Sequence, residues 1–281
     1  MSLDQHSSAP SGNCDVATKP LATEGSEPKI EYFAAFNYFF EHPEWGNSLL
    51  MGSVCMLIPI LNGIVLAGYR YEIVEMKLRF PERLYPKFDF ARFSQYITRG
   101  IWPFLIDMIV QMVLVVPMLV VFYGSMIGIG IAVASNERVG LIVAAIVVPL
   151  VMLFFMTVSL LLSTAMVPLY LRAGLAQDFG QALNFRWIKD FLAKVGFQTL
   201  LFTLFLMVTG GILGIVGYAA CIVGLFPVIF LLAGPVVGHA HYQLYRLYLA
   251  RGGEPIPLKP LPTEPAYAPP VPGSPVPKPP M

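Results

Sequence analysis

Charged residues are scarce in this chain. Only 12% of its 281 residues are Asp, Glu, Lys or Arg, whereas a soluble domain has about 25%. Hydrophobic residues make up 56% of the chain, and the mean hydropathy is +0.68. The formal net charge of +1 gives no reason to expect a nucleic-acid partner. This composition argues against a soluble globular domain and indicates a protein whose main solvent is lipid.

Cysteine is scarce as well. Cys14, Cys55 and Cys221 are far apart, and the last two lie in apolar runs, where cysteine acts as a small hydrophobic residue. The sequence therefore has no disulfide framework and no spacing typical of metal ligands. His239 and His241 are two residues apart, so on a helix they point to different faces and do not chelate one metal. We expect neither a metal nor a cofactor.

Sequence signatures of catalysis are also missing. The chain has no phosphate-binding glycine loop followed by lysine, no zinc-protease His-Glu pair, and no Ser, His and Asp set at one membrane depth. We therefore expect a protein that is not an enzyme and has no catalytic residues. The first 28 residues contain no apolar stretch, so we also expect no cleaved signal peptide there.

Long apolar segments are what the chain has in abundance. A helix needs about 20 apolar residues to cross the hydrocarbon core of a bilayer. The last two predicted spans come from one apolar run that several glycines divide. The five predicted spans cover approximately residues 47–69, 101–134, 139–171, 193–215 and 218–245.

The predicted fold is all-α, a polytopic bundle of about five transmembrane helices over residues 31–252. Residues 1–30 are polar and are predicted to be a disordered tail. Residues 253–281 are rich in proline and are predicted to be a second disordered tail. Proline spacing alone also allows the second tail to be a ligand for a peptide-binding groove.

Tyrosine and arginine follow the apolar segments. Amphipathic rings and long cationic side chains are favoured at the headgroup level, so these pairs are predicted to anchor the helix ends. Basic residues are concentrated in the loops after the first, third and fifth spans, which predicts a multi-pass protein of the cell membrane with a cytoplasmic C-terminus. The predicted anchors are Tyr69, Arg70, Tyr170, Arg172, Tyr245 and Arg246.

The first apolar segment allows two topologies. Pro59 lies inside it, and a half-helix that enters the membrane and turns at this proline is the alternative to a continuous span. A continuous span puts the N-terminus outside, whereas the re-entrant half-helix followed by a full span puts it inside. Pro227 has a similar setting, since each proline precedes a run that ends at a glycine. The two prolines predict equivalent helix breaks, as in transporters.

An internal repeat precedes two of the spans. Residues 88–99 align without gaps with residues 183–194, and Asp89 then matches Asn184. Asp and Asn are good N-cap residues, and apolar residues at spacings of three predict a short amphipathic helix that lies in the interface before each span. The other interpretation is that such lead-in segments look alike in any membrane protein.

Asp107 is the candidate polar site. It is the only acidic residue well inside a predicted span, and Gln111 lies one turn further along the same face, so the pair is a candidate site for a cation or a proton. The structural alternative is that Asp107 lies near the interface and pairs with Arg70 or Arg172 of a neighbouring helix.

Three stretches resemble the uncharacterised prokaryotic membrane family DUF4013. They are IPILNGIVLAGY at residues 58–69, LYPKFDFARFSQYITRG at 84–100, and PLYLRAGLAQDFGQALNFRWI at 168–188. The residues that fit the pattern of the family are Pro59, Gly68, Tyr69, Pro86, Asp89, Gly100, Ala182 and Leu183.

The sequence departs from the family pattern at two positions. Tyr85 is inserted before Pro86, and Phe88 stands where the family tends to have tryptophan. The resemblance covers approximately residues 33–252. It implies a bacterial or archaeal polytopic membrane protein, and it carries over no catalytic residues.

The function that the sequence favours is a non-enzymatic membrane component that organises partners or lipids. The alternative is a permease for a small solute or an ion, with Asp107 and Gln111 near the path. The expected partner is the lipid bilayer. Small residues four apart, such as Gly124 and Gly128, allow close packing within one chain, in a homo-oligomer or against other membrane proteins.

Overall fold

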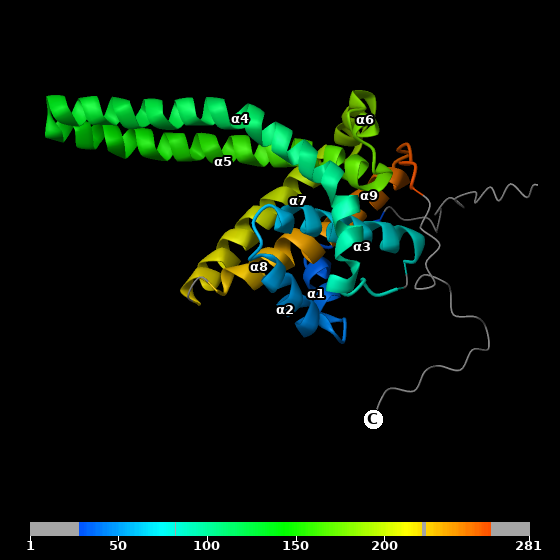
Figure 1. The fold of residues 1–281 in the computed structure, drawn as a ribbon. Helices are drawn as coiled ribbons and strands as arrows, with labels where there is room; N and C mark the ends of the chain where they lie inside the picture. Colours follow the sequence, from blue (N-terminus) through cyan, green and yellow to red (C-terminus); the bar gives the residue numbers. More distant parts are fainter. Residues whose placement is uncertain (1–27, 82, 221–222, 260–281) are drawn as a thin grey trace, which may run out of the picture.

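The described residues of the computed structural model, 28–81, 83–220 and 223–259, contain helices and no strand (Figure 1). The predicted all-α class is therefore confirmed for this part of the chain. The helices are α1 (Ala34–Phe40), α2 (Trp45–Cys55), α3 (Leu61–Arg79), η1 (Phe90–Arg92), α4 (Phe93–Ser135), α5 (Glu137–Ala176), α6 (Phe179–Ala182), α7 (Phe185–Ala219), α8 (Leu225–Leu231), η2 (Leu232–Val236) and α9 (Val237–Ala250).

Four helical segments in the described residues are long and apolar enough to cross a membrane. Each one contains most of a span that the sequence predicts, and the predicted count of about five is not confirmed. The four segments are Phe90–Ser135, Glu137–Ala176, Phe185–Ala219 and Leu225–Ala250.

The continuous helix expected over residues 47–69 is instead two helices. α2 ends at Cys55 and α3 begins at Leu61, and Pro59 lies in the turn between them. Proline has no amide hydrogen to donate, and Ile60 has a positive φ of 68°, which ends the helical path. The second half of α3 also carries charged residues, so this helix is not one of the four apolar segments. The turn at Pro59 agrees with the alternative of two helices in this segment, and entry of the first of them into the membrane stays a prediction.

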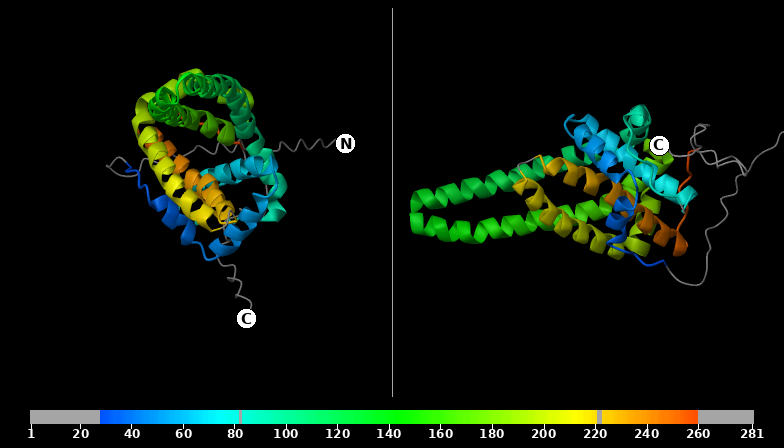
Figure 2. Two further views of the ribbon diagram at one scale, coloured as in Figure 1. Left: turned by 90° about the vertical axis from the view of Figure 1, so that its left-hand side faces the viewer. Right: turned by 90° about the horizontal axis from the view of Figure 1, so that it is seen from below.

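α4 and α5 form one antiparallel hairpin that extends well beyond the other helices (Figures 1 and 2). They have 43 and 40 residues, which at 1.5 Å per residue is about 65 and 60 Å. Asn136 joins them as the N-cap of α5, because its side chain accepts a hydrogen bond of 3.0 Å from the Arg138 amide.

α7 and the continuous run of α8, η2 and α9 form a second, shorter hairpin (Figure 2). η2 is a π-helix that contains Pro235. Pro227 lies in the first turn of α8, where backbone amides have no acceptor within the helix. The missing amide hydrogen of proline therefore does not interrupt the helix. The break expected at Pro227 is therefore corrected to a distortion at Pro235, where a proline inside the helix removes a backbone hydrogen bond.

The short interfacial helices expected over residues 88–99 and 183–194 are not separate elements. The first leads through η1 into α4, and the second forms the beginning of α7. The expected caps are confirmed, since the Asp89 side chain accepts from the Ala91 amide and the Asn184 side chain accepts from the Trp187 amide. The polar lead-in and the apolar span are in each case one continuous helical path.

α3 lies at the centre of the body and packs closely against α4. A Cβ atom on Gly68 would lie 1.9 Å from the carbonyl oxygen of Tyr96, and one on Gly100 would lie 1.8 Å from the carbonyl oxygen of Ile64. The backbones of the two helices therefore touch, and only glycine fits at this crossing. The crossing fixes the base of the long hairpin against the body.

Candidate functional site

The charged residues of the body are concentrated where α3, α5 and α9 end and where α4 and α7 begin, and we call this the charged end. The helix-joining turn at Asn136 lies at the opposite end of the long hairpin (Figure 1). Contacts across the charged end join segments far apart in sequence, such as Arg79 to the carbonyl of Lys259 and Trp187 to the carbonyl of Glu254. The charged end is therefore one folded surface.

Two buried glutamates of α3 join it to α4. The side chains of Glu72 and Glu75 are each about 5% exposed. Glu75 accepts contacts of 2.7 Å from Arg79 and 2.6 Å from Arg99, and Glu72 pairs with Arg92. A buried carboxylate is tolerated only when it is paired, so these contacts are required for α3 to pack here.

The sequence analysis did not predict this cluster, because it assigned the cations after the first apolar segment to a loop. The signal was present in the spacing of α3, where Glu72 and Glu75 lie on adjacent turns among apolar residues. Carboxylates in such a position need cationic partners, and the following segment supplies Arg92 and Arg99.

Arg70 and His241 form polar contacts between α3 and the last helix. The Nε of Arg70 donates a hydrogen bond of 2.8 Å to the carbonyl of Ala233 in the π-helix η2. The neighbouring Tyr71 hydroxyl lies 3.4 Å from Nδ1 of His241, and both side chains are buried. The irregular backbone at Pro235 thus meets a cationic side chain from α3.

Asp107 and Gln111 lie one turn apart on α4, and a shared polar site stays a prediction for them. Asp107 accepts a hydrogen bond from the hydroxyl of Tyr170, which comes from α5. Gln111 is exposed on the outer surface of α4. The guanidinium groups expected beside Asp107 bond to backbone carbonyls instead, since Arg70 donates to Ala233 and Arg172 donates to Gln181.

The other predicted anchors also bond within the protein. The Tyr69 hydroxyl donates to the carbonyl of Pro86 at 2.9 Å, and its ring is fully buried. Arg172 lies 5.4 Å from the ring of Trp187. Arg246 contacts the ring of Tyr242, and the Tyr245 hydroxyl accepts from the Ile256 amide at 2.7 Å. Anchoring at the membrane interface stays a prediction for these six residues.

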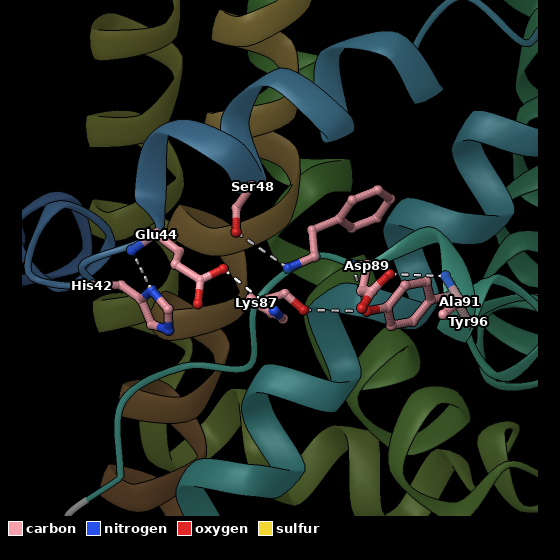
Figure 3. A network of polar contacts seen from close by, with 8 residues as sticks. His42, Glu44, Ser48, Lys87, Asp89, Ala91 and Tyr96 are labelled. Atoms are coloured by element: carbon pink, nitrogen blue, oxygen red, sulfur yellow. Dashed lines mark hydrogen bonds and ion pairs between the residues drawn. The ribbon is translucent and has the colours of Figure 1, made fainter. Parts of the chain in front are cut away.

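A polar network joins the segment before η1 to the start of α2 (Figure 3). The Phe88 amide donates to Ser48, and Lys87 forms an ion pair of 3.3 Å with Glu44. His42 accepts a hydrogen bond of 3.0 Å from the Glu44 amide. Burial lowers the pKa of His42, and the Lys87 cation lowers it further, whereas Glu44 acts in the opposite direction. The net effect is that protonation of this imidazole is disfavoured in the folded protein.

Three buried polar atoms beside this network have no hydrogen-bond partner among the described residues. They are the hydroxyls of Tyr38 and Tyr85 and Nδ1 of His239. The Tyr38 ring lies 5.4 Å from the Tyr85 ring and 4.6 Å from the His239 ring, with the ammonium of Lys77 4.5 Å above it. Burial raises the pKa of both tyrosines well above 10, so both hydroxyls stay protonated.

An extended segment after α9, residues 252–259, lies across the charged end, and we call it the strap. The indole of Trp187 donates to the carbonyl of Glu254 at 2.8 Å, and Ile256 is only 3% exposed. Arg79 donates to the carbonyl of Lys259 at 2.7 Å. Residues 253–259 of the tail predicted over residues 253–281 therefore make contacts with the helices, and residues 260–281 lie outside the described part of the chain.

Contacts with the helices begin at the boundary of the N-terminal tail predicted over residues 1–30. Gln243 of α9 exchanges two hydrogen bonds with the backbone of Glu31, at 2.9 and 3.1 Å. Ile30 packs against the same apolar cluster as the strap. Residues 1–27 lie outside the described residues.

A cleft of about 550 Å³ lies between the beginning of α7 and the strap. Its polar lining comes from both segments. Lys194 has two partners in the cleft, because its ammonium donates 2.9 Å hydrogen bonds to Asp190 and to the carbonyl of Gly252. The charged and aromatic residues that line the cleft are Arg186, Trp187, Lys189, Asp190, Lys194, Tyr248 and Glu254.

Apolar helices around a charged end define a helical protein suited to a lipid bilayer. The model of the family DUF4013, described as protein of unknown function, matches residues 51–237. The chain belongs to this family. No curated protein and no solved structure matches the chain.

Proposed function

We propose that this protein is a non-enzymatic, multi-pass component of the cell membrane that organises lipids or other membrane proteins through its α4–α5 hairpin. The observation that carries the proposal is the exposed apolar surface of this hairpin. Val113, Val120 and Ile127 of α4 are 69, 67 and 62% exposed, and Met152 of α5 is 65% exposed. In water such a surface would drive aggregation, whereas acyl chains or apolar helices cover it without cost.

The length of the hairpin supports the same proposal. Residues 139–171 of α5 contain no charged side chain, and at 1.5 Å per residue they are about 50 Å long. The hydrocarbon core is about 30 Å thick. A helix with this much apolar surface lies in the bilayer at a strong tilt, which increases its contact with neighbours in the membrane.

We infer that the charged end faces the cytoplasm. It carries nearly all of the described Lys and Arg residues, and the opposite end of the hairpin carries Arg138. Each hairpin leaves the charged end and returns to it, so residue 28 and residue 259 lie on the same side of the membrane. The excess of basic residues on that side supports its assignment to the cytoplasm.

The permease alternative has less support. A transport path needs polar side chains that converge at one depth, but Asp107 is bonded to Tyr170 and Gln111 is exposed on the outside of α4. The apolar surface of the hairpin therefore carries the proposal, and the polar residues of α4 do not.

The proposal is tested by photo-crosslinking in cells. A photoreactive amino acid at Val120 or Met152 is expected to form abundant adducts with lipid, with a second copy or with another membrane protein. The same amino acid at Phe191, which is fully buried, serves as the control. Adduct yields at the two hairpin positions no higher than at Phe191 would refute the proposal.

A further inference from the structure

The cleft at the beginning of α7 contains two cations that form no hydrogen bond or ion pair with the described residues. Arg186 and Lys189 both line it and are both exposed. Neither side chain forms a hydrogen bond or an ion pair with another described residue. Several other cations of the charged end are engaged, as in the contacts of Lys194 with Asp190 and of Arg99 with Glu75. Arg186 and Lys189 are therefore available to an anionic ligand.

The charge balance of the cleft favours a ligand with a single negative charge. Asp190 is compensated by Lys194 at 2.9 Å and also accepts a hydrogen bond of 2.8 Å from Tyr248. The remaining charges are the cations Arg186 and Lys189 against the carboxylate of Glu254. One positive charge is left, and a phosphodiester carries one negative charge that guanidinium and ammonium groups bind well.

An exposed apolar stripe runs along α7 directly from these cations. Ala193, Phe197 and Leu204 follow Arg186 by 7, 11 and 18 residues, which are close to two, three and five turns of 3.6 residues, so all four lie on one face. Phe197 is 67% exposed and Leu204 is 44% exposed. The surface is thus cationic where α7 begins and apolar where α7 continues into the membrane.

We propose that this surface binds a phospholipid, with the head-group phosphate between Arg186 and Lys189 and the acyl chains along the stripe of Ala193, Phe197 and Leu204. The inference rests on the proposed placement of the charged end at the membrane surface, and it names a lipid class that the proposed function leaves open. A soluble phosphate matches the cations alone, whereas only a lipid also covers the stripe.

The test is retention of phosphatidylglycerol by the purified full-length protein, measured by native mass spectrometry from detergent. Each cation near a membrane surface contributes about 1 kcal/mol, so the double variant Arg186→Gln/Lys189→Gln is expected to retain at least tenfold less lipid. The charge-retaining double variant Arg186→Lys/Lys189→Arg is expected to bind as the wild type does. Gel filtration and thermal unfolding establish that each variant is folded.

The matched control removes two cations of the charged end that do not line the cleft. Arg83→Gln/Lys259→Gln is expected to retain the lipid at the wild-type level. Equal retention in all variants, or an equal loss in the control, would overturn the assignment. Displacement of the lipid by millimolar glycerol phosphate would also overturn it, because the site would then take a soluble phosphate. These outcomes are independent of crosslinking at the α4–α5 hairpin, so the two proposals fail separately.

Discussion

Glu75 is a buried carboxylate held between two arginines of different helices. Arg79 comes from one turn later in α3, whereas Arg99 comes from α4. The exposed pair of Lys87 with Glu44 has the same charges in a different setting, since about half of each side chain faces solvent. The two pairs therefore differ in how much of the carboxylate loses water, and this difference decides how much each contributes to stability.

Arg99→Met is expected to lower the free energy of unfolding by about 3 kcal/mol, because the buried carboxylate of Glu75 loses a partner and no water replaces it. Lys87→Met is the matched control, and its expected effect is below about 1 kcal/mol. Thermal unfolding in detergent measures both variants. Equal effects of the two substitutions would contradict the assigned role of burial.

Tyr69→Phe is expected to destabilise the protein by about 1 kcal/mol, because the carbonyl of Pro86 loses its donor in a buried place. Tyr38→Phe removes a buried hydroxyl that has no partner among the described residues, so no loss of stability is expected. Unfolding midpoints of the two variants measured side by side test this difference. A greater loss in Tyr38→Phe would show that its hydroxyl has a stabilising contact.

His42 is expected to make stability depend on pH. Its pKa in the folded protein lies below the unfolded value of about 6.5. The folded state therefore binds fewer protons, and the contribution of His42 is complete above pH 6.5 and is lost as the pH falls. The difference in unfolding free energy between wild type and His42→Gln should shrink from pH 8 to pH 5. A difference that grows toward low pH would reverse the assigned sign.

At the scale of helices, the crossing of α3 and α4 is the tightest contact described. Gly68→Ala is expected to cost about 3 kcal/mol or to prevent folding, because its Cβ would lie 1.9 Å from a backbone oxygen. Gly128→Ala in the hairpin is the control, since no atom lies within 4 Å of the added Cβ. Expression level and unfolding midpoint report both effects, and similar losses at the two positions would exclude close packing as the cause.

Helix ends could be predicted from sequence where a local interaction sets them. The Asp89 side chain accepts from the amide two residues later and the Asn184 side chain from the amide three residues later, so the neighbours in sequence are sufficient to predict these caps. The count of spans could not be predicted, because hydropathy averages over Pro59 and does not detect that α2 and α3 are separate helices. The interfacial helices were wrongly predicted as separate elements for a related reason. A polar lead-in followed by an apolar span gives the same hydropathy pattern whether the two form one helix or two.

The candidate site was harder to predict than the helices. Asp107 was recognised from its rarity in an apolar segment, but its partner Tyr170 depends on the register of α4 against α5, which the sequence does not specify. The cleft at α7 was missed because one of its sides comes from the strap, which supplies Gly252, Gly253 and Glu254 and lies at the start of the segment that was predicted to be a disordered tail. Sites built from residues distant in sequence require the fold.

For the whole molecule, both ends of the described chain are expected on one side of the membrane. In a variant without its native cysteines, single cysteines at Lys29 and Arg83 should resist a membrane-impermeant maleimide added to intact cells. A cysteine at Glu137, next to the hairpin turn, should react. Labelling of Lys29→Cys with protection of Arg83→Cys would instead support a continuous first span with the N-terminus outside.

The strap determines where the polypeptide tolerates being shortened or extended. A protein ending at Gly253 lacks the Glu254 carbonyl that accepts from Trp187. It also lacks the buried Ile256 side chain, so the apolar residues that Ile256 covers become exposed. One ending at Lys259 keeps both contacts and also the carbonyl that Arg79 binds. Affinity tags and fluorescent reporters therefore belong after Lys259, where they leave the strap in place across the charged end.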